Sequence, residues 1–430
     1  MKVFEEFKNW GPYISYGYDS SSEMRISFET EYYYTQKSIL YAKENNKFQK
    51  IEYTWCEPDK HHCFILKNLQ PNTEYYYKIV VGNSLKGKKD ERIDKVYKFK
   101  TGIALNENEN ADNDENSFEF TIVGDMHAKF GSNISKSFEI MDLVTPNRAF
   151  TITLGDCIDD GNEELDWQSF FRDLNKWLPF IPIMNVTGNH DAGDHTKYSR
   201  FIKTFDHPYI NKEKGAFYSF RYGNAAFIML DSNNAGNFEP TPSDEQYEWL
   251  ESELKKYNEL NLWIFVMLHH QIYSSGDFAM SPIAHQVYRP LFDEYHVDAV
   301  FYGHDHHFEA FWTNKKSNWG GTKYFVVGAG GDQNHVDYSI MGDRDGATKY
   351  IWPGRIYSYK QHGIISPSNN ISEYAKGFRN DEIVKNAQLF GILEPHFVYV
   401  RIKGNNCFLK TIGYQKQVFF ELNFKKNIHK

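Results

Sequence analysis

The sequence predicts an α/β protein: a layered β-sandwich flanked by helices, preceded by an all-β sandwich. Two observations indicate this fold class. From residue 118 onward, apolar strand-like runs alternate with helix-like segments, which is typical of a domain with buried sheets. Before residue 105, strand-like runs follow one another across turn signals, as in a β-sandwich. An acidic segment separates the two regions.

The acidic segment, LNENENADNDENS, covers residues 105–117 and predicts a linker. Its many Asn, Asp and Glu side chains favour water, so the segment is not expected to join a packed core. We therefore expect a β-sandwich domain over 1–104, a linker over 105–117 and an α/β domain over 118–430.

The first domain contains the pattern of a tyrosine corner, in which a Tyr hydroxyl bonds to the backbone upstream and fixes a crossover between sheets. In the segment LKNLQPNTEYYYKI, the residues of this corner are Leu69, Pro71, Thr73 and Tyr75. With this pattern, the domain resembles a fibronectin type III domain. It contains no side chain with an evident catalytic role, so we expect a structural or docking module.

The second domain alternates strands and helices. Continuous apolar runs predict strands over 118–125, 149–156, 180–190, 262–270 and 298–307. Helical spacing of apolar residues predicts helices over 166–178 and 246–258, and the pair Gly223-Asn224 predicts the turn of a hairpin over 216–232. The tail, from HFVYVRIKG to the end, alternates like antiparallel strands that close a sheet.

Composition argues against some functions. The chain has 430 residues, with 57 acidic and 48 basic side chains and a net charge of −9. A dedicated nucleic-acid binder normally has a basic face, so we expect no nucleic-acid polymer as a partner. The N-terminus, MKVFEEFKNW, has no apolar run long enough for a signal peptide, and no stretch approaches a membrane span. The sequence as written therefore favours a cytoplasmic protein without membrane contact, and it does not predict an oligomeric state.

Five short blocks of metal-binding residue types follow the predicted strands, at 124–127, 155–160, 188–191, 267–270 and 303–307. Loops at the carboxyl ends of strands meet at one edge of an α/β sheet, so we expect these blocks to form one site. Together they offer Asp125, His127, Asp156, Asn189, His269, His304 and His306. This set is large enough for two ions such as Fe, Zn or Mn, which together can clamp a phosphoryl group. Asp156 is the candidate for the carboxylate shared by both ions.

The ordered blocks resemble those of the calcineurin-like metallophosphoesterase superfamily. The preceding sandwich, and GAGG at 328–331 after the last block, make the chain similar to its purple acid phosphatase-like branch. The resemblance implies a layered metallophosphoesterase fold and two bound ions. It assigns Asp125, His127, Asp156 and His306 to one ion, and Asp156, Asn189, His269 and His304 to the other.

The resemblance also implies a function: hydrolysis of a small phosphomonoester by attack of a metal-bound hydroxide. A phosphodiesterase acting on nucleotides or related small diesters fits the same ligands and stays open. A non-catalytic binding protein is a more distant alternative, since none of the seven ligands is missing.

Further site residues are expected around these ligands. His190, inside GNHD, is the candidate proton donor to the leaving group or stabiliser of the transition state, and Asp191 is expected to orient its ring. Candidates for contact with the substrate are His195, Tyr273 and His307.

Two departures from related patterns narrow these expectations. Purple acid phosphatases have a metal-binding Tyr where this chain has Asp159, and Gly where it has His127, so we expect no iron–tyrosinate colour. Protein Ser/Thr phosphatases of the superfamily have Arg where this chain has Asp160 and Thr187. A phosphoprotein substrate is therefore disfavoured.

Overall fold

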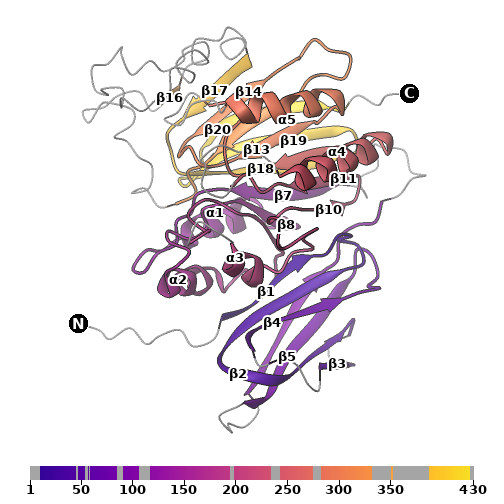
Figure 1. Cartoon of the computed structure of the whole chain (residues 1–430), viewed down its shortest axis with the longest axis vertical. Helices are drawn as coiled ribbons and strands as arrows, with labels where there is room; N and C mark the ends of the chain where they lie inside the picture. The colour runs from indigo at the N-terminus through magenta and orange to yellow at the C-terminus, as the bar shows by residue number, and fades with distance from the viewer. Residues whose placement is uncertain are drawn as a thin grey trace.

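The computed structural model describes most of the chain. The described residues are 10–44, 47–53, 57, 59–84, 91–105, 117–193, 198–233, 243–274, 282–331, 350–351 and 387–426. An all-β part built from the first hundred residues lies at one end of the molecule, and the α/β part forms the rest (Figure 1). The predicted fold class is confirmed. No helix in the described ranges combines the length and apolar character needed to cross a membrane.

The N-terminal part is a six-stranded assembly around one long strand. Its strands are β1 (Trp10–Tyr16), β2 (Met24–Ala42), β3 (Gln49–Tyr53), β4 (Asp59–Leu66), β5 (Glu74–Ser84) and β6 (Glu91–Lys100). Strand β2 is 19 residues long. Its first half pairs with β1 and β4 and its second half with β3 and β5, so one strand serves both faces of the sandwich.

The tyrosine corner is present as predicted. The hydroxyl of Tyr75, at the start of β5, accepts a hydrogen bond from the backbone N–H of Gln70 at 2.9 Å. Leu69 is buried in the same core, and its N–H donates to the carbonyl of Ser22 at 3.0 Å. These contacts fix the loop that leads from β4 into β5.

Two sheets form the centre of the α/β part. One sheet has the order β20-β19-β18-β7-β8-β9, and its strands are β7 (Phe118–Val123), β8 (Phe150–Leu154), β9 (Ile183–Val186), β18 (His396–Lys403), β19 (Asn406–Gly413) and β20 (Val418–Lys425). Strands β7 to β9 are parallel, and β18 to β20 continue the sheet in antiparallel fashion, as expected for the tail.

The second sheet has the order β10-β11-β12-β13-β15-β14-β17-β16. Its strands are β10 (Tyr218–Tyr222), β11 (Ala225–Met229), β12 (Trp263–Met267), β13 (Ala299–Tyr302), β14 (Phe308–Trp312), β15 (Lys323–Val327), β16 (Tyr350–Ile351) and β17 (Gln388–Ile392). The predicted hairpin is formed by β10 and β11, and Gly223 in its turn has φ +55°. Strands β11, β12, β13 and β15 are parallel neighbours.

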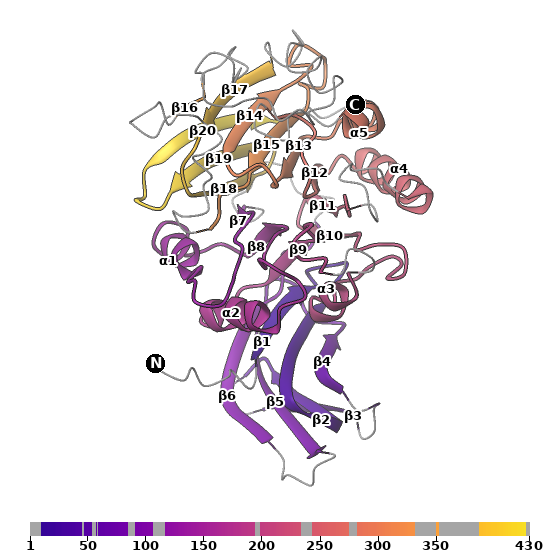
Figure 2. The ribbon, with the colours of Figure 1, turned by 60° about the vertical axis from the view of Figure 1, so that its left-hand side comes forward.

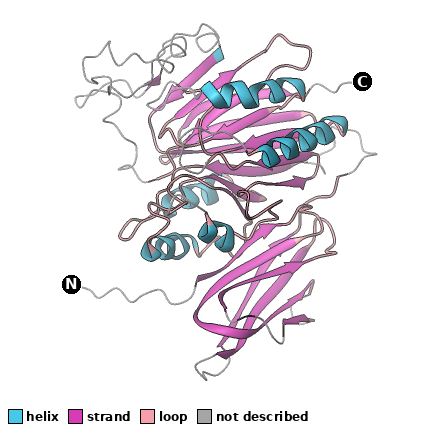
Figure 3. Ribbon diagram, in the orientation of Figure 1, coloured by secondary structure: helices cyan, strands magenta, loops and turns pink. Residues whose placement is uncertain are grey.

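Helices cover the outer faces of the two sheets. They are α1 (Ser135–Val144), α2 (Glu164–Leu174), α3 (Ser199–Thr204), α4 (Asp244–Glu259) and α5 (Pro282–Glu294). Helices α4 and α5 pack on the second sheet, whereas α1 to α3 lie on the side of the first (Figures 2 and 3). Leu250 and Leu254 of α4 thus bury their side chains against Ile264 of β12.

The inner faces of the two sheets meet in an aromatic core. The ring of Phe227, on β11, lies 5.2 Å from that of Phe120 on β7 and 5.3 Å from that of Phe150 on β8. Both contacts are edge-to-face, and all three side chains are fully buried. Each such ring buries on the order of 150–250 Å² of surface. This core sets the relative position of the two sheets.

The N-terminal sandwich is attached to the α/β part through β1. The N–H of Ile14 donates to the carbonyl of Leu178 at 3.0 Å, and the hydroxyl of Tyr13 donates to the carbonyl of Thr204, at the end of α3, at 2.5 Å. The ring of Tyr16 packs against Phe150 and Phe220, with centroid distances of 5.9 and 6.4 Å. The sandwich therefore shares a core with the sheet of β7 to β9.

Candidate metal centre

All five blocks follow the carboxyl ends of parallel strands. Blocks 124–127, 155–160 and 188–191 come after the neighbouring strands β7, β8 and β9. Blocks 267–270 and 303–307 come after β12 and β13, which are neighbours in the other sheet. The expected site is therefore built from two sheets and lies where their carboxyl-terminal edges meet.

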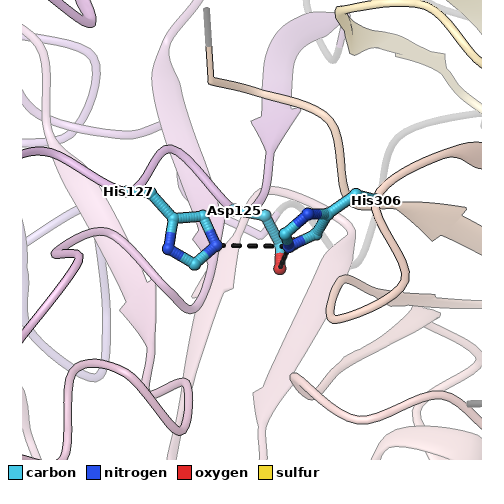
Figure 4. A group of neighbouring side chains, drawn as sticks. All are labelled: Asp125, His127 and His306. Atoms are coloured by element: carbon cyan, nitrogen blue, oxygen red, sulfur yellow. Dashed lines mark hydrogen bonds and ion pairs between the residues drawn. The ribbon is translucent and has the colours of Figure 1, made fainter. Parts of the chain in front are cut away.

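One group of candidate ligands joins the loops after β7 and β13. Asp125, His127 and His306 each offer a donor atom, and these atoms lie within 4.8 Å of one another. The two rings turn their Nε2 atoms toward each other at 3.2 Å, and Asp125 Oδ1 lies 3.5 Å from His306 Nε2 (Figure 4). Nitrogen and oxygen donors converge on one point, as a metal ion requires.

A second group lies beside the first. Asp156, His269 and His304 are all buried, and their donor atoms also lie within 4.8 Å of one another. The side-chain oxygen of Asn189 is 2.9 Å from His269 Nε2, so Asn189 joins this group. The structure brings all seven residues of the predicted ligand set into these two groups.

Asp156 lies between the two groups. Its Oδ2 is 3.7 Å from Nε2 of His127, in the first group, and 3.3 Å from Nε2 of His269, in the second. Its Oδ1 accepts the backbone N–H of His190 at 2.9 Å. One oxygen is thus held by the protein and the other faces both groups, which is the arrangement of a shared carboxylate.

A backbone carbonyl fixes the tautomer of His269. Its Nδ1 lies 2.7 Å from the carbonyl oxygen of Leu154, at the end of β8. A carbonyl only accepts hydrogen bonds, so Nδ1 carries the hydrogen and Nε2 keeps its lone pair for a metal ion. This is the usual way in which an outer partner orients a ligating imidazole.

The backbone at the ligands is unusual. Asp125, His127, Asp156 and His304 have φ values of +55°, +47°, +48° and +68°, in the left-handed region. Such values are uncommon outside glycine, and Asp, Asn and His tolerate them best. The glycine before Asn189 is required by space, because a Cβ on Gly188 would lie 2.1 Å from Asp156 Oδ1.

The electrostatics of the cluster favour positive charge. Burial lowers the pKa of His269, but Asp156 and Asp125 outweigh it and raise this pKa to about 9. Asp125 and Asp156 raise the pKa of His306 to about 9 in the same way, against burial. A metal cation would supply the positive charge that the carboxylates favour and would displace these protons. The donor set, its convergence and its charge all fit two metal ions.

A backbone carbonyl holds one ring nitrogen of His190. Its side chain is exposed, and its Nδ1 lies 2.6 Å from the backbone carbonyl of Asp159, so Nδ1 is the donor and Nε2 is available. The His190 ring centroid is 4.6 Å from that of His127. His190 is therefore exposed to solvent and lies beside the first group of candidate ligands.

Asp191 does not orient this ring, contrary to expectation. Its carboxylate is buried and accepts the N–H groups of Gly188 at 2.9 Å and Ile158 at 3.0 Å. Burial and the nearby Asp156 raise its pKa. Asp191 thus connects the loop after β9 to the loop after β8, and the carbonyl of Asp159 has the orienting role.

Asp159 also contacts a ligand, which sequence reasoning did not anticipate. Its Oδ1 is 3.4 Å from Nδ1 of His127, and hydrogen bonding to that ring lowers the pKa of the Asp159 carboxyl. The sequence did offer one indication of this contact: a carboxylate stands at the position of the metal-binding Tyr of purple acid phosphatases. The shorter residue contacts the ligand His127.

Two of the three candidates for substrate contact, His307 and Tyr273, are buried. His307 is buried, with its Nε2 3.0 Å from Glu309 Oε2. Tyr273 is fully buried, and its ring packs against Tyr324 and Phe311 at 4.8 and 5.7 Å. Both positions argue against direct contact with a substrate. His195 lies outside the described residues.

Comparison with known proteins agrees with this geometry. The family model described as calcineurin-like phosphoesterase matches residues 118–308, and that of the purple acid phosphatase N-terminal domain matches residues 10–101. A purple acid phosphatase of Glycine max is 26% identical over 266 residues, which cover 58% of this chain and 52% of that protein. Purple acid phosphatase 21 of Arabidopsis thaliana is 25% identical over 338 residues, covering 72% of this chain and 69% of that protein. The match therefore spans about half the length of the first relative.

Solved structures share the fold. A purple acid phosphatase, PPD1, from yellow lupin seeds superposes with a TM-score of 0.69 at 18% identity, covering 98% of this chain and 75% of that one. PhoD superposes with a TM-score of 0.60 at 12% identity, covering 99% and 92%. Two family models thus match successive parts of the chain: that of the purple acid phosphatase N-terminal domain, and after it that of the calcineurin-like phosphoesterases.

Proposed function

We propose that this chain hydrolyses small phosphomonoesters, using two metal ions held at the edge where its two sheets meet. The observation that carries the proposal is the position of Asp156 Oδ2, 3.7 Å from His127 Nε2 and 3.3 Å from His269 Nε2. A structural metal site is normally closed and rich in thiolate, whereas this one has a shared carboxylate and an exposed His190 beside it.

The bound ions would supply an activated water and neutralise charge on the phosphoryl group. The assignment of ligands follows the two groups. We propose Asp125, His127, Asp156 and His306 for one ion and Asp156, Asn189, His269 and His304 for the other. The proposed substrate-facing group is His190, whose Nε2 would donate a proton to the leaving oxygen while Nδ1 is held by the Asp159 carbonyl.

The identity of the ions can be narrowed by colour and by elemental analysis. Asp159 stands where an iron-binding Tyr would stand, so we expect a protein that holds Fe, Zn or Mn and lacks the purple colour of iron–tyrosinate. Mass spectrometry of the purified protein would measure the ions. An absorption band typical of iron–tyrosinate would contradict the assignment.

The test of function compares a monoester with a diester. The metal-loaded protein should hydrolyse p-nitrophenyl phosphate with a higher kcat/KM than bis-p-nitrophenyl phosphate. The variant His190→Asn should lose about 10²–10⁴-fold in kcat while keeping its metal content, because it removes only the proton donor. The control variant His296→Asn, far from the site, should keep the kcat and the metal content of the wild type. A higher kcat/KM for the diester would favour the phosphodiesterase alternative. An unchanged kcat in His190→Asn would exclude the proposed role of His190.

Two wider features belong to the same proposal. Residues 118–430 would carry catalysis, with 1–104 as the attached sandwich and 105–117 as the linker between them. We also expect a cytoplasmic location and no nucleic-acid or membrane partner. Cell fractionation of the full-length protein would test the location.

A further inference from the structure

The turn after His127 places a positive charge next to the proposed site. The Lys129 side chain is about half exposed, and its Nζ lies 3.9 Å from Asp159 Oδ2. Phe130, the next residue, has an exposed fraction of 50%. The sequence predicts no role for either residue, and the proposed hydrolysis does not use them.

Asp159 contacts both Lys129 and the proposed proton donor. The backbone carbonyl of Asp159 holds His190 Nδ1 at 2.6 Å, its Oδ1 is 3.4 Å from His127, and its Oδ2 is the atom near Lys129. One residue thus contacts the proposed proton donor, a ligand of the first group and the lysine. Asp159 therefore connects Lys129 with the proposed proton donor.

The turn that presents Lys129 is held in place. Ser132 Oγ accepts the N–H of Lys129 at 3.1 Å and donates to its carbonyl at 2.9 Å. The N–H of Phe130 donates to the largely buried Asp166 at 2.7 Å, and an Arg172 amino group donates to the Ser132 carbonyl at 3.3 Å. The backbone is fixed at both residues, so only the side chains need to adapt to a ligand.

The charge of Lys129 can be used by a ligand. Its ion pair with Asp159 is partly exposed and long, and such pairs contribute little to stability. Turning Nζ from this carboxylate to an anion of the substrate therefore costs little. The partly exposed ring of Phe130 offers an apolar surface beside that anion.

We propose that Lys129, with Phe130 beside it, forms a subsite for an anionic group carried by the leaving group. The preferred substrates would be phosphomonoesters whose leaving group bears a second anion, such as a carboxylate or another phosphate. This inference rests on the proposed phosphomonoesterase function, and it names the substrate class for that site.

The test uses two substrates that differ by one carboxylate on the leaving group: phenyl phosphate and 4-carboxyphenyl phosphate. The metal-loaded wild type should favour the carboxylated substrate about two- to fivefold in kcat/KM, the range expected for one exposed ion pair. Lys129→Met should remove this preference and Lys129→Arg should keep it. Lys136→Met, a change at an exposed position on α1, should leave the ratio unchanged.

The ratio of the two kcat/KM values decides the outcome. A wild-type preference that falls as salt is raised, and that is absent in Lys129→Met, supports the subsite. An equal ratio in wild type and Lys129→Met would overturn it while the phosphatase function stands. If the wild type hydrolyses neither substrate but does hydrolyse bis-p-nitrophenyl phosphate, the proposed function fails and the subsite fails with it.

Discussion

The two sheets contribute different chemistry to the metal centre. The loops after β7, β8 and β9 bring the carboxylates Asp125 and Asp156 and the amide of Asn189, together with one imidazole, that of His127. The loops after β12 and β13 bring only imidazoles to the ligand set. One half of the site therefore carries the negative charge, and the other half completes the coordination with nitrogen donors.

This difference predicts which substitutions should weaken metal binding most. The carboxylates of the first half favour bound positive charge, as the raised pKa values of His269 and His306 show. The imidazole half contributes only if the two sheets are held in register across their common aromatic core. Changes to charge, to sheet packing and to outer contacts should thus have effects of decreasing size.

The largest effect is expected from the shared carboxylate. Asp156→Asn should lower kcat by at least about 10³-fold. The substitution weakens the binding of both ions, and several kcal/mol of charge stabilisation in the transition state are lost with them. His304→Asn, in the imidazole half, should weaken mainly one ion. Metal analysis beside a p-nitrophenyl phosphate assay would compare them. Two ions and full activity in Asp156→Asn would contradict the shared role.

The packing between the sheets should matter next. Phe227→Ala should destabilise the protein by about 3–5 kcal/mol, because it removes a fully buried ring that contacts Phe120 and Phe150. Phe227→Leu is the milder control. Urea unfolding measures both, and metal affinity should fall with stability in the alanine variant. Unchanged stability would show that this core does not hold the sheets together.

The contact of Asp159 with His127 should have a smaller effect. Asp159→Asn should weaken metal binding about 10–100-fold, as is usual when the outer partner of a ligating His is changed. Asp160→Asn, at the exposed neighbouring position, should bind metal like the wild type. Competition with a chelator measures the affinity. Equal affinities in the two variants would mean that the 3.4 Å contact does not orient the ring.

Acid should weaken the carboxylate half through His207. Burial, with a further contribution from Arg25, lowers the pKa of His207 to about 3 in the folded protein, against 6.5 as its ordinary value. The unfolded chain then binds a proton that the folded protein does not, so stability is lost as pH falls below about 6.5, by about 1.4 kcal/mol per pH unit. His207→Gln should reduce that slope in urea unfolding at pH 6.5 and 5. An unchanged slope would assign acid sensitivity to other groups.

His207 matters to the site because it supports the strand that leads into GNHD. Its Nε2 accepts the N–H of Asn185, on β9, at 3.1 Å, and its ring stacks on Tyr218 with a centroid distance of 4.6 Å. Protonation of this ring would therefore disturb the strand that ends just before Asn189.

Most of the fold and the ligand set could be predicted from the sequence. Apolar runs ending in Asp or His predicted strand ends, and the structure groups six of the seven candidate ligands there, with Asn189 beside His269. Contacts made by the backbone could not be predicted: the carbonyls of Leu154 and Asp159 select the tautomers of His269 and His190, and any residue offers a carbonyl. The burial of Tyr273 could not be predicted either, because this residue follows one of the five blocks in the sequence but packs into the core.

The left-handed backbone at Asp125, His127, Asp156 and His304 limits how this site can change. Each of these residues holds a donor atom and a conformation that most side chains disfavour. Gly would remove the donor and keep the turn, whereas Val or Ile would disturb both. The loss of metal binding can therefore be separated from the loss of folding, and redesign of the centre has a narrow range of substitutions to work with.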